Sequence, residues 1–87
     1  MRDYTELQNA GNKAGLEKLK MNEHKTGVDD IEIEYAYNRI LEEAEELGVE
    51  INKHFWNKGN LEAIRHEAAD VRNFCDMIIL RCDKEIS

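Results

Sequence analysis

The sequence predicts an all-α fold, a short bundle of about three helices with an antiparallel helix hairpin at its core. None of the 87 residues is proline. Apolar residues recur at spacings of three and four along two long segments, and short clusters of Asn, Asp and Gly separate the segments. We expect one domain, residues 1–87, whose limited core makes oligomerisation to a four-helix-type bundle favourable.

The first predicted helix runs from about Asp3 to Met21. Its apolar residues have a mixed helical spacing: Leu7, Ala10, Ala14 and Leu19. Gly11 and Gly15 lie among them, and each weakens a helix by about 1 kcal/mol relative to alanine. The segment from Asn22 to Val28 is predicted to be a loop.

A second helix is predicted from about Ile31 to Phe55, with Asp29 or Asp30 as its N-cap. Alternation over residues 31–35 is typical of a strand, but a lone strand has no partner in this sequence. One apolar stripe follows the helix at 4-3-4-4 spacing: Ile40, Ala44, Leu47, Ile51 and Phe55. Gly48 lies inside this helix, where it indicates either close backbone packing or a tolerated glycine.

A turn is predicted at residues 57–60, and Asn60 is a good N-cap for a third helix from about Leu61 to Lys84. The apolar stripe of that helix comprises Leu61, Ile64, Ala68, Val71, Cys75, Ile78 and Cys82. Because the connection is so short, the two long helices should form an antiparallel hairpin.

Charge and hydropathy exclude several classes of function. The chain has 12 basic and 19 acidic residues and a net charge of −7, which argues against binding to nucleic acid or to an anionic membrane. Its apolar runs are too short for a membrane span or a signal peptide, so we expect a cytoplasmic protein.

The two cysteines do not form a structural site. Cys75 and Cys82 lie seven residues apart in one predicted helix, about 10.5 Å along its axis, which excludes a disulfide between them. The sequence has no CxxC and no paired histidine motif that would bind structural zinc. Both residues are therefore expected to be core thiols in a reducing compartment.

The negative charge is concentrated between Asp29 and Glu50, where nine acidic residues accompany a single basic residue, Arg39. This segment contains an EExxE pattern, Glu42-Glu43-Ala44-Glu45-Glu46, and the third helix contains an ExxD pattern, Glu67-Ala68-Ala69-Asp70. Arg39 precedes Glu43 by four residues and is expected to pair with it.

At 100° per residue, Glu43 and Glu46 lie on one flank of the apolar stripe of their helix, and Glu67 and Asp70 lie on the equivalent flank of theirs. The hairpin therefore brings four carboxylates together: Glu43, Glu46, Glu67 and Asp70. Clustered carboxylates raise one another's pKa unless a cation neutralises them, and oxygen ligands suit Mg²⁺. The alternative is a solvated acidic face. A ferritin-like di-iron site is excluded, because it needs Glu-x-x-His and neither His54 nor His66 has that spacing.

Residues 35–83 resemble the MazG-like, all-α NTP pyrophosphohydrolases, especially their small phage and viral members. The two-part EExxE and ExxD motif carries the resemblance, together with the run around Arg39-Ile-Leu-Glu-Glu and Glu67-Ala-Ala-Asp-Val-Arg-Asn-Phe. The resemblance implies Mg²⁺-dependent hydrolysis of a nucleoside triphosphate, a deoxy or modified one included, to the monophosphate and pyrophosphate. It also implies a homodimer or homotetramer, in the host cytoplasm if the protein is viral.

By the same resemblance, Glu43, Glu46, Glu67 and Asp70 would bind Mg²⁺, with Mn²⁺ as a substitute. Glu42 would assist Glu43 in catalysis, as an outer hydrogen-bonding group or as the base that orients the attacking water. Candidate phosphate ligands are Lys53, Lys58, Arg65 and Arg81, although such residues are more often plain surface charges. Asn73 could reach the metal's water or the sugar. Trp56 either stacks on the base or closes the helix end.

Two other functions remain open at this point. The chain could be a non-catalytic helical interaction protein that keeps the fold and binds a host or self partner. It could also be an acidic mimic of nucleic acid, although such a mimic needs its charge spread along a surface rather than clustered.

Overall fold

A computed structural model describes residues 3–22, 31–56 and 59–86 of the chain. Within these ranges it contains three α-helices and no strand: α1 (Thr5–Met21), α2 (Ile33–Phe55) and α3 (Leu61–Ile86). The predicted all-α class is confirmed. Both ends of each predicted helix lie within two residues of the ends of an observed helix. No helix in the described ranges is long and apolar enough to cross a membrane. The predicted caps Asp29 and Asp30 lie outside the described residues, as do most of the loop before them and positions 57–58 of the turn.

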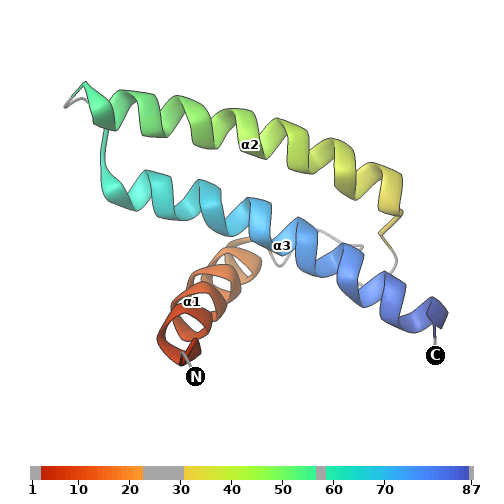
Figure 1. Ribbon diagram of the computed structural model, residues 1–87. Helices are drawn as coiled ribbons and strands as arrows, with labels where there is room; N and C mark the ends of the chain where they lie inside the picture. The colour runs from red at the N-terminus through yellow and green to blue at the C-terminus, as the bar shows by residue number, and fades with distance from the viewer. Residues whose placement is uncertain (1–2, 23–30, 57–58, 87) are drawn as a thin grey trace.

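The two long helices, α2 and α3, lie side by side and antiparallel, and α1 packs across α3 (Figure 1). Among the described residues, α1 contacts α3 and not α2. The predicted hairpin is therefore present. Asn60 caps α3 as predicted, because its Oδ1 accepts a hydrogen bond of 2.6 Å from the backbone N–H of Ala63.

The predicted apolar stripe of α2 does not all face α3. Ile40 and Leu47 are half-buried, but Ala44, Ile51 and Phe55 are exposed, and Phe55 keeps 80% of its surface. Ala36 and Glu43 instead occupy the buried side of α2. The reason is that the apolar arc of α2 is wider than the strip that one neighbouring helix can cover.

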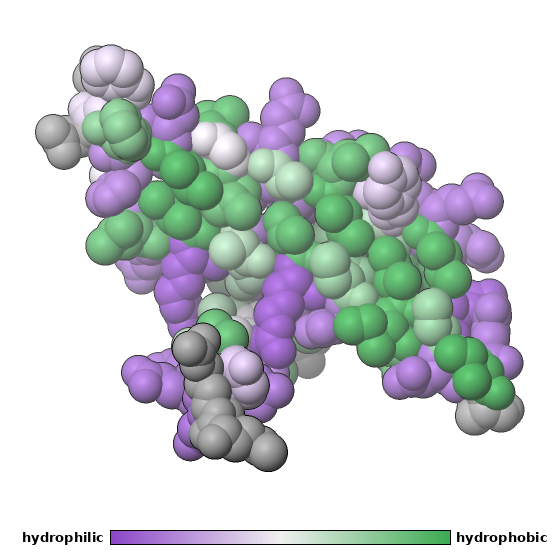
Figure 2. All heavy atoms as spheres, in the orientation of Figure 1, coloured by the Kyte–Doolittle hydropathy of each residue, from purple (hydrophilic) through white to green (hydrophobic). Residues whose placement is uncertain are grey.

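On α3, Leu61, Ala68 and Cys75 of the predicted stripe are also exposed, so the expectation that Cys75 is a core thiol is wrong. The uncovered part of the α2 arc continues over these residues of α3. We call it the open apolar face, and it consists of Tyr37, Leu41, Ala44, Gly48, Ile51 and Phe55 on α2 and of Leu61, Ala68, Cys75, Ile79 and Ile86 on α3. Figure 2 shows hydrophobic residues gathered over both helices on one side of the hairpin. No neighbouring atom lies within 4 Å of a Cβ built at Gly48, so this glycine does not serve packing within the described chain.

The interior of the single chain is correspondingly small. Among the described residues, the buried hydrophobic side chains are Ala36 and Ala69, and no large side chain is fully buried. The accessible surface is 6972 Å², whereas a compact monomer of this mass exposes about 5,300 Å². The chain therefore exposes far more surface than its size requires.

Several polar contacts join α1 to α3. A Cβ added at Gly15 would lie 2.8 Å from Asn73 Oδ1, so the glycine allows the two helices to approach closely. Asn73 is buried, and its Nδ2 donates a hydrogen bond of 3.0 Å to the carbonyl oxygen of Gly15. Arg72 Nη2 donates to Asn12 Oδ1 at 2.6 Å. These contacts fix where α1 lies along α3.

Candidate metal centre

Three carboxylates from two helices meet between α2 and α3. Glu43 and Glu46 are one turn apart on α2, and Glu67 faces them from α3. One oxygen of each lies within 4.8 Å of the others. Their i,i+3 spacing places Glu43 and Glu46 on neighbouring turns of one side of α2. Glu67 of α3 can therefore lie close to both of them.

Two of these carboxylate groups point an oxygen into the interior without a partner. Glu43 is only 5% exposed and Glu67 is half-buried. The Oε2 atoms of both are buried and accept no hydrogen bond from any of the described residues. A buried carboxylate oxygen without a donor is costly, unless it carries a proton or binds a cation.

The pKa values of these groups reflect the same crowding. Burial, followed by the proximity of Glu46, Asp70 and Glu67, raises the pKa of Glu43 to about 8. Burial, followed by the proximity of Glu46 and Asp70, also raises the pKa of Glu67, although its contact with Glu43 acts in the opposite direction. In the absence of a cation, the cluster therefore holds at least part of a proton at neutral pH.

Arg39 is the basic residue that contacts Glu43. Its Nη2 donates to Glu43 Oε1 at 2.8 Å, and its Nη1 donates to Glu42. The guanidinium carbon also lies 5.5 Å from the ring centroid of Phe74 on α3. The predicted Arg39–Glu43 pair is confirmed.

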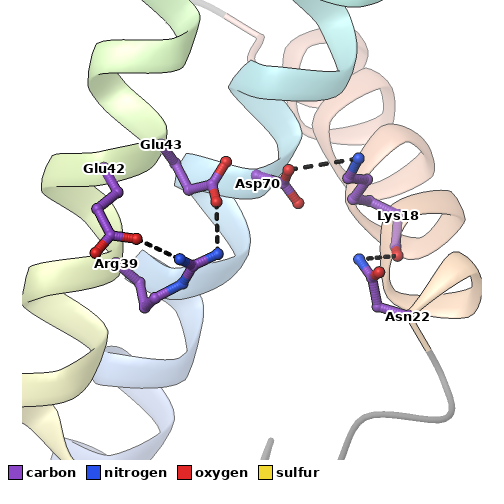
Figure 3. Close-up of polar contacts among 6 residues, drawn as sticks. All are labelled: Lys18, Asn22, Arg39, Glu42, Glu43 and Asp70. Carbon is purple, nitrogen blue, oxygen red and sulfur yellow. Dashed lines mark hydrogen bonds and ion pairs between the residues drawn. The ribbon is translucent and has the colours of Figure 1, made fainter.

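Asp70, the fourth predicted ligand, lies at the edge of the cluster and pairs with α1. Lys18 Nζ lies 3.4 Å from Asp70 Oδ2, and both side chains are more than four-fifths buried. Figure 3 shows Arg39 and Lys18 approaching from opposite sides, with Glu43 and Asp70 between them. Asp70 remains close enough to Glu43 to raise its pKa.

The other predicted site residues lie in different surroundings. Glu42 is exposed and held by Arg39, and with Glu45, Glu46 and Val49 it lines a shallow depression on α2. Asn73 faces α1 rather than the carboxylates. Trp56 is 68% exposed and packs edge-on against Phe55.

The predicted phosphate ligands are engaged with other groups. Lys53 pairs with Glu50 at 3.3 Å, and Arg65 pairs with Glu17 of α1 at 2.7 Å. Arg81 donates to Glu85 and to the carbonyl oxygen of Ile31. Lys58 lies outside the described residues. Sequence reasoning missed Lys18, because a residue 52 positions before Asp70 gives no local signal of the contact.

Comparisons with known proteins do not decide what this site does. No protein family, curated protein or solved structure matches the chain. The functional argument therefore depends on the geometry of the carboxylate cluster.

The cluster has the donor set of a site for a hard divalent cation. Its ligands are all carboxylate oxygens, which suit Mg²⁺, Mn²⁺ and Ca²⁺ better than softer metals. Three close carboxylates leave room in an octahedral shell for water or for phosphate oxygens.

Proposed function

We propose that the chain is a Mg²⁺-dependent nucleoside triphosphate pyrophosphohydrolase of the MazG-like kind. The observation that carries the proposal is the pair of buried, unpartnered oxygens, Glu43 Oε2 and Glu67 Oε2, in a group of three carboxylates. A purely solvated acidic face would not bury these atoms. The EExxE and ExxD spacing supports the choice of nucleotide hydrolysis among Mg²⁺-dependent reactions.

In this proposal Glu43, Glu46 and Glu67 hold the cation, and Asp70 turns from Lys18 to complete the set. Bound Mg²⁺ would neutralise charge on the phosphate oxygens. Arg39 fixes Glu43 through one carboxylate oxygen and so leaves the other oxygen directed into the cluster. Such positioning is the main contribution that a protein makes to phosphoryl transfer.

The reaction needs a water oxygen to attack the α-phosphorus. The bond from that phosphorus to the bridging oxygen breaks, the nucleoside monophosphate keeps the new oxygen, and pyrophosphate leaves with the bridging oxygen. Glu42, exposed beside the cluster and held by Arg39, would accept the proton of the attacking water.

We further propose that two copies of the chain associate through the open apolar face. The chain exposes roughly 1,700 Å² more than a compact monomer of its mass, and a standard interface removes about 800 Å² from each partner. A second copy would bring two further helices onto α2 and α3 and form a four-helix arrangement. Gly48 and Ala44 would let the facing helix approach closely.

The same face supports a second candidate function, that of a non-catalytic helical interaction protein. In that case the apolar face would bind a partner, and the carboxylates would have no catalytic role. The two candidate functions therefore predict different effects of replacing a buried carboxylate.

The test is to incubate the purified protein with canonical and modified nucleoside triphosphates, with and without Mg²⁺, and to measure pyrophosphate release. We expect release that needs Mg²⁺ and that is lost in Glu67→Gln. Glu45→Gln is the control, because Glu45 is an exposed glutamate of α2 that is not one of the three clustered carboxylates. If no nucleotide is cleaved, the enzyme proposal is wrong and the interaction protein is favoured.

A further inference from the structure

Lys18 of α1 forms an ion pair with Asp70 of α3, a contact that the α1 helix does not need in order to form. It lies three residues after Gly15, which is buried against Asn73 of α3, and it extends its ammonium group to Asp70. The neighbouring lysines of α1, Lys13 and Lys20, are exposed, whereas the side chain of Lys18 is 18% exposed. The packing of α1 therefore places one particular lysine at the carboxylate cluster.

We infer that Lys18 is a phosphate-binding residue, which pairs with Asp70 in the metal-free chain and binds the substrate's polyphosphate once Asp70 binds the cation. This inference rests on the proposed function and adds a residue and a helix to its site. It gives α1 a role in substrate binding that neither acidic motif indicates.

The distribution of charge supports this role. Among the described residues, Arg39 and Lys18 are the basic side chains with ion pairs to the four carboxylates. Arg39 is already bound to two carboxylates and stacked on Phe74. The ion pair that Lys18 forms with the described residues is the one to Asp70, at 3.4 Å, which is longer than the usual 2.7–2.9 Å of a strong charged hydrogen bond.

A cation in the cluster would compete with Lys18 for Asp70. When Asp70 turns to the cation, the ammonium group loses its partner while it stays partly shielded from water, and an unpaired charge there is unfavourable. A polyphosphate bound to the same cation brings several negative oxygens close to Lys18. Lys53 and Arg65, by contrast, already pair with glutamates outside the cluster.

The test compares Lys18→Met, which keeps the aliphatic stem and loses the charge, with Lys18→Arg and with the control Lys20→Met. Mn²⁺ binding to each protein is measured first by electron paramagnetic resonance. Inorganic pyrophosphate is then titrated into the Mn²⁺-loaded proteins by calorimetry. Far-ultraviolet circular dichroism of each variant checks that the helices remain.

We expect Lys18→Met to bind Mn²⁺ at least as tightly as the wild type, because a competing cation has been removed. Its affinity for pyrophosphate should fall by about tenfold or more, because one charged hydrogen bond is lost. Lys18→Arg should recover most of that affinity, and Lys20→Met should match the wild type in both titrations.

Two results would overturn the inference while leaving the proposed function intact. One is unchanged pyrophosphate affinity in Lys18→Met, and the other is weaker Mn²⁺ binding in that variant, which would make Lys18 a structural residue. If the wild type itself binds no Mn²⁺, the proposed function fails and the inference fails with it.

Discussion

Arg39 Nη2 lies 2.8 Å from Glu43 Oε1, and the other oxygen of the same carboxylate accepts no hydrogen bond within the part of the chain that the structure describes. One side of Glu43 is thus fixed by the protein, and the other side is free to bind a cation. This division distinguishes Glu43 from an ordinary surface glutamate in an i,i+4 pair.

Replacing Arg39 by alanine should destabilise the chain by about 1–3 kcal/mol, because Glu43 loses the donor that compensates its burial. Glu42→Gln is the matched control, since Glu42 is exposed and its pair with Arg39 should contribute at most about 1 kcal/mol. Urea denaturation followed by circular dichroism measures both. Equal losses in the two variants would show that burial of Glu43 has no energetic importance.

The metal-free protein should lose stability as the pH rises. Glu43 has a pKa of about 8 when folded and an ordinary pKa near 4.5 when unfolded. Between these values the folded state binds more protons, so the free energy of unfolding falls with increasing pH. Urea denaturation in the presence of a chelator, at several pH values between 5 and 8, measures the trend. Glu43→Gln should flatten it, and a stability that rises over this range in the wild type would contradict the account.

Gly15→Ala should destabilise the chain even though alanine is the better helix former by about 1 kcal/mol. The new Cβ would lie 2.8 Å from Oδ1 of the buried Asn73. Gly11→Ala is the control, because its nearest neighbour is the end of the flexible Arg72 side chain, which can move. In thermal unfolding, the midpoint temperature of Gly15→Ala should be lower than that of Gly11→Ala. The reverse order would mean that α1 does not pack closely on α3.

A lysine on the open apolar face should disrupt association. Leu41→Lys introduces charge at a residue of that face which is half-exposed in the single chain, and Leu16→Lys is the control on α1, with similar exposure. Analytical ultracentrifugation should show a dimer or larger for the wild type and Leu16→Lys, and a smaller species for Leu41→Lys. A wild type that is monomeric at all concentrations would refute association through this face.

Sequence periodicity predicted the helices well, because three- and four-residue spacing and the Asn60 cap are local signals. It also predicted the meeting of Glu43, Glu46 and Glu67, since the short connection leaves the hairpin little freedom of register. The side of α2 that faces α3 was less predictable. Periodicity identifies an apolar arc but not which part of it one neighbouring helix covers.

Contacts of α1 could not be predicted from the sequence. From the sequence, Gly11 and Gly15 could be interpreted only as residues that weaken a helix. In the structure they leave space for the side chains of Arg72 and Asn73. The pair between Lys18 and Asp70 joins segments far apart in the chain, and no spacing rule relates them. Long-range polar contacts of this kind depend on the docking angle of a whole helix.

The central claim is that the carboxylates between α2 and α3 form a cation site. The most direct measurement is calorimetric titration of Mn²⁺ into the metal-free wild type, Glu67→Gln and the exposed control Glu45→Gln. We predict saturable binding by the wild type and by Glu45→Gln, and a loss of at least tenfold in affinity for Glu67→Gln. Absence of binding by the wild type, or equal binding by all three proteins, would contradict the claim.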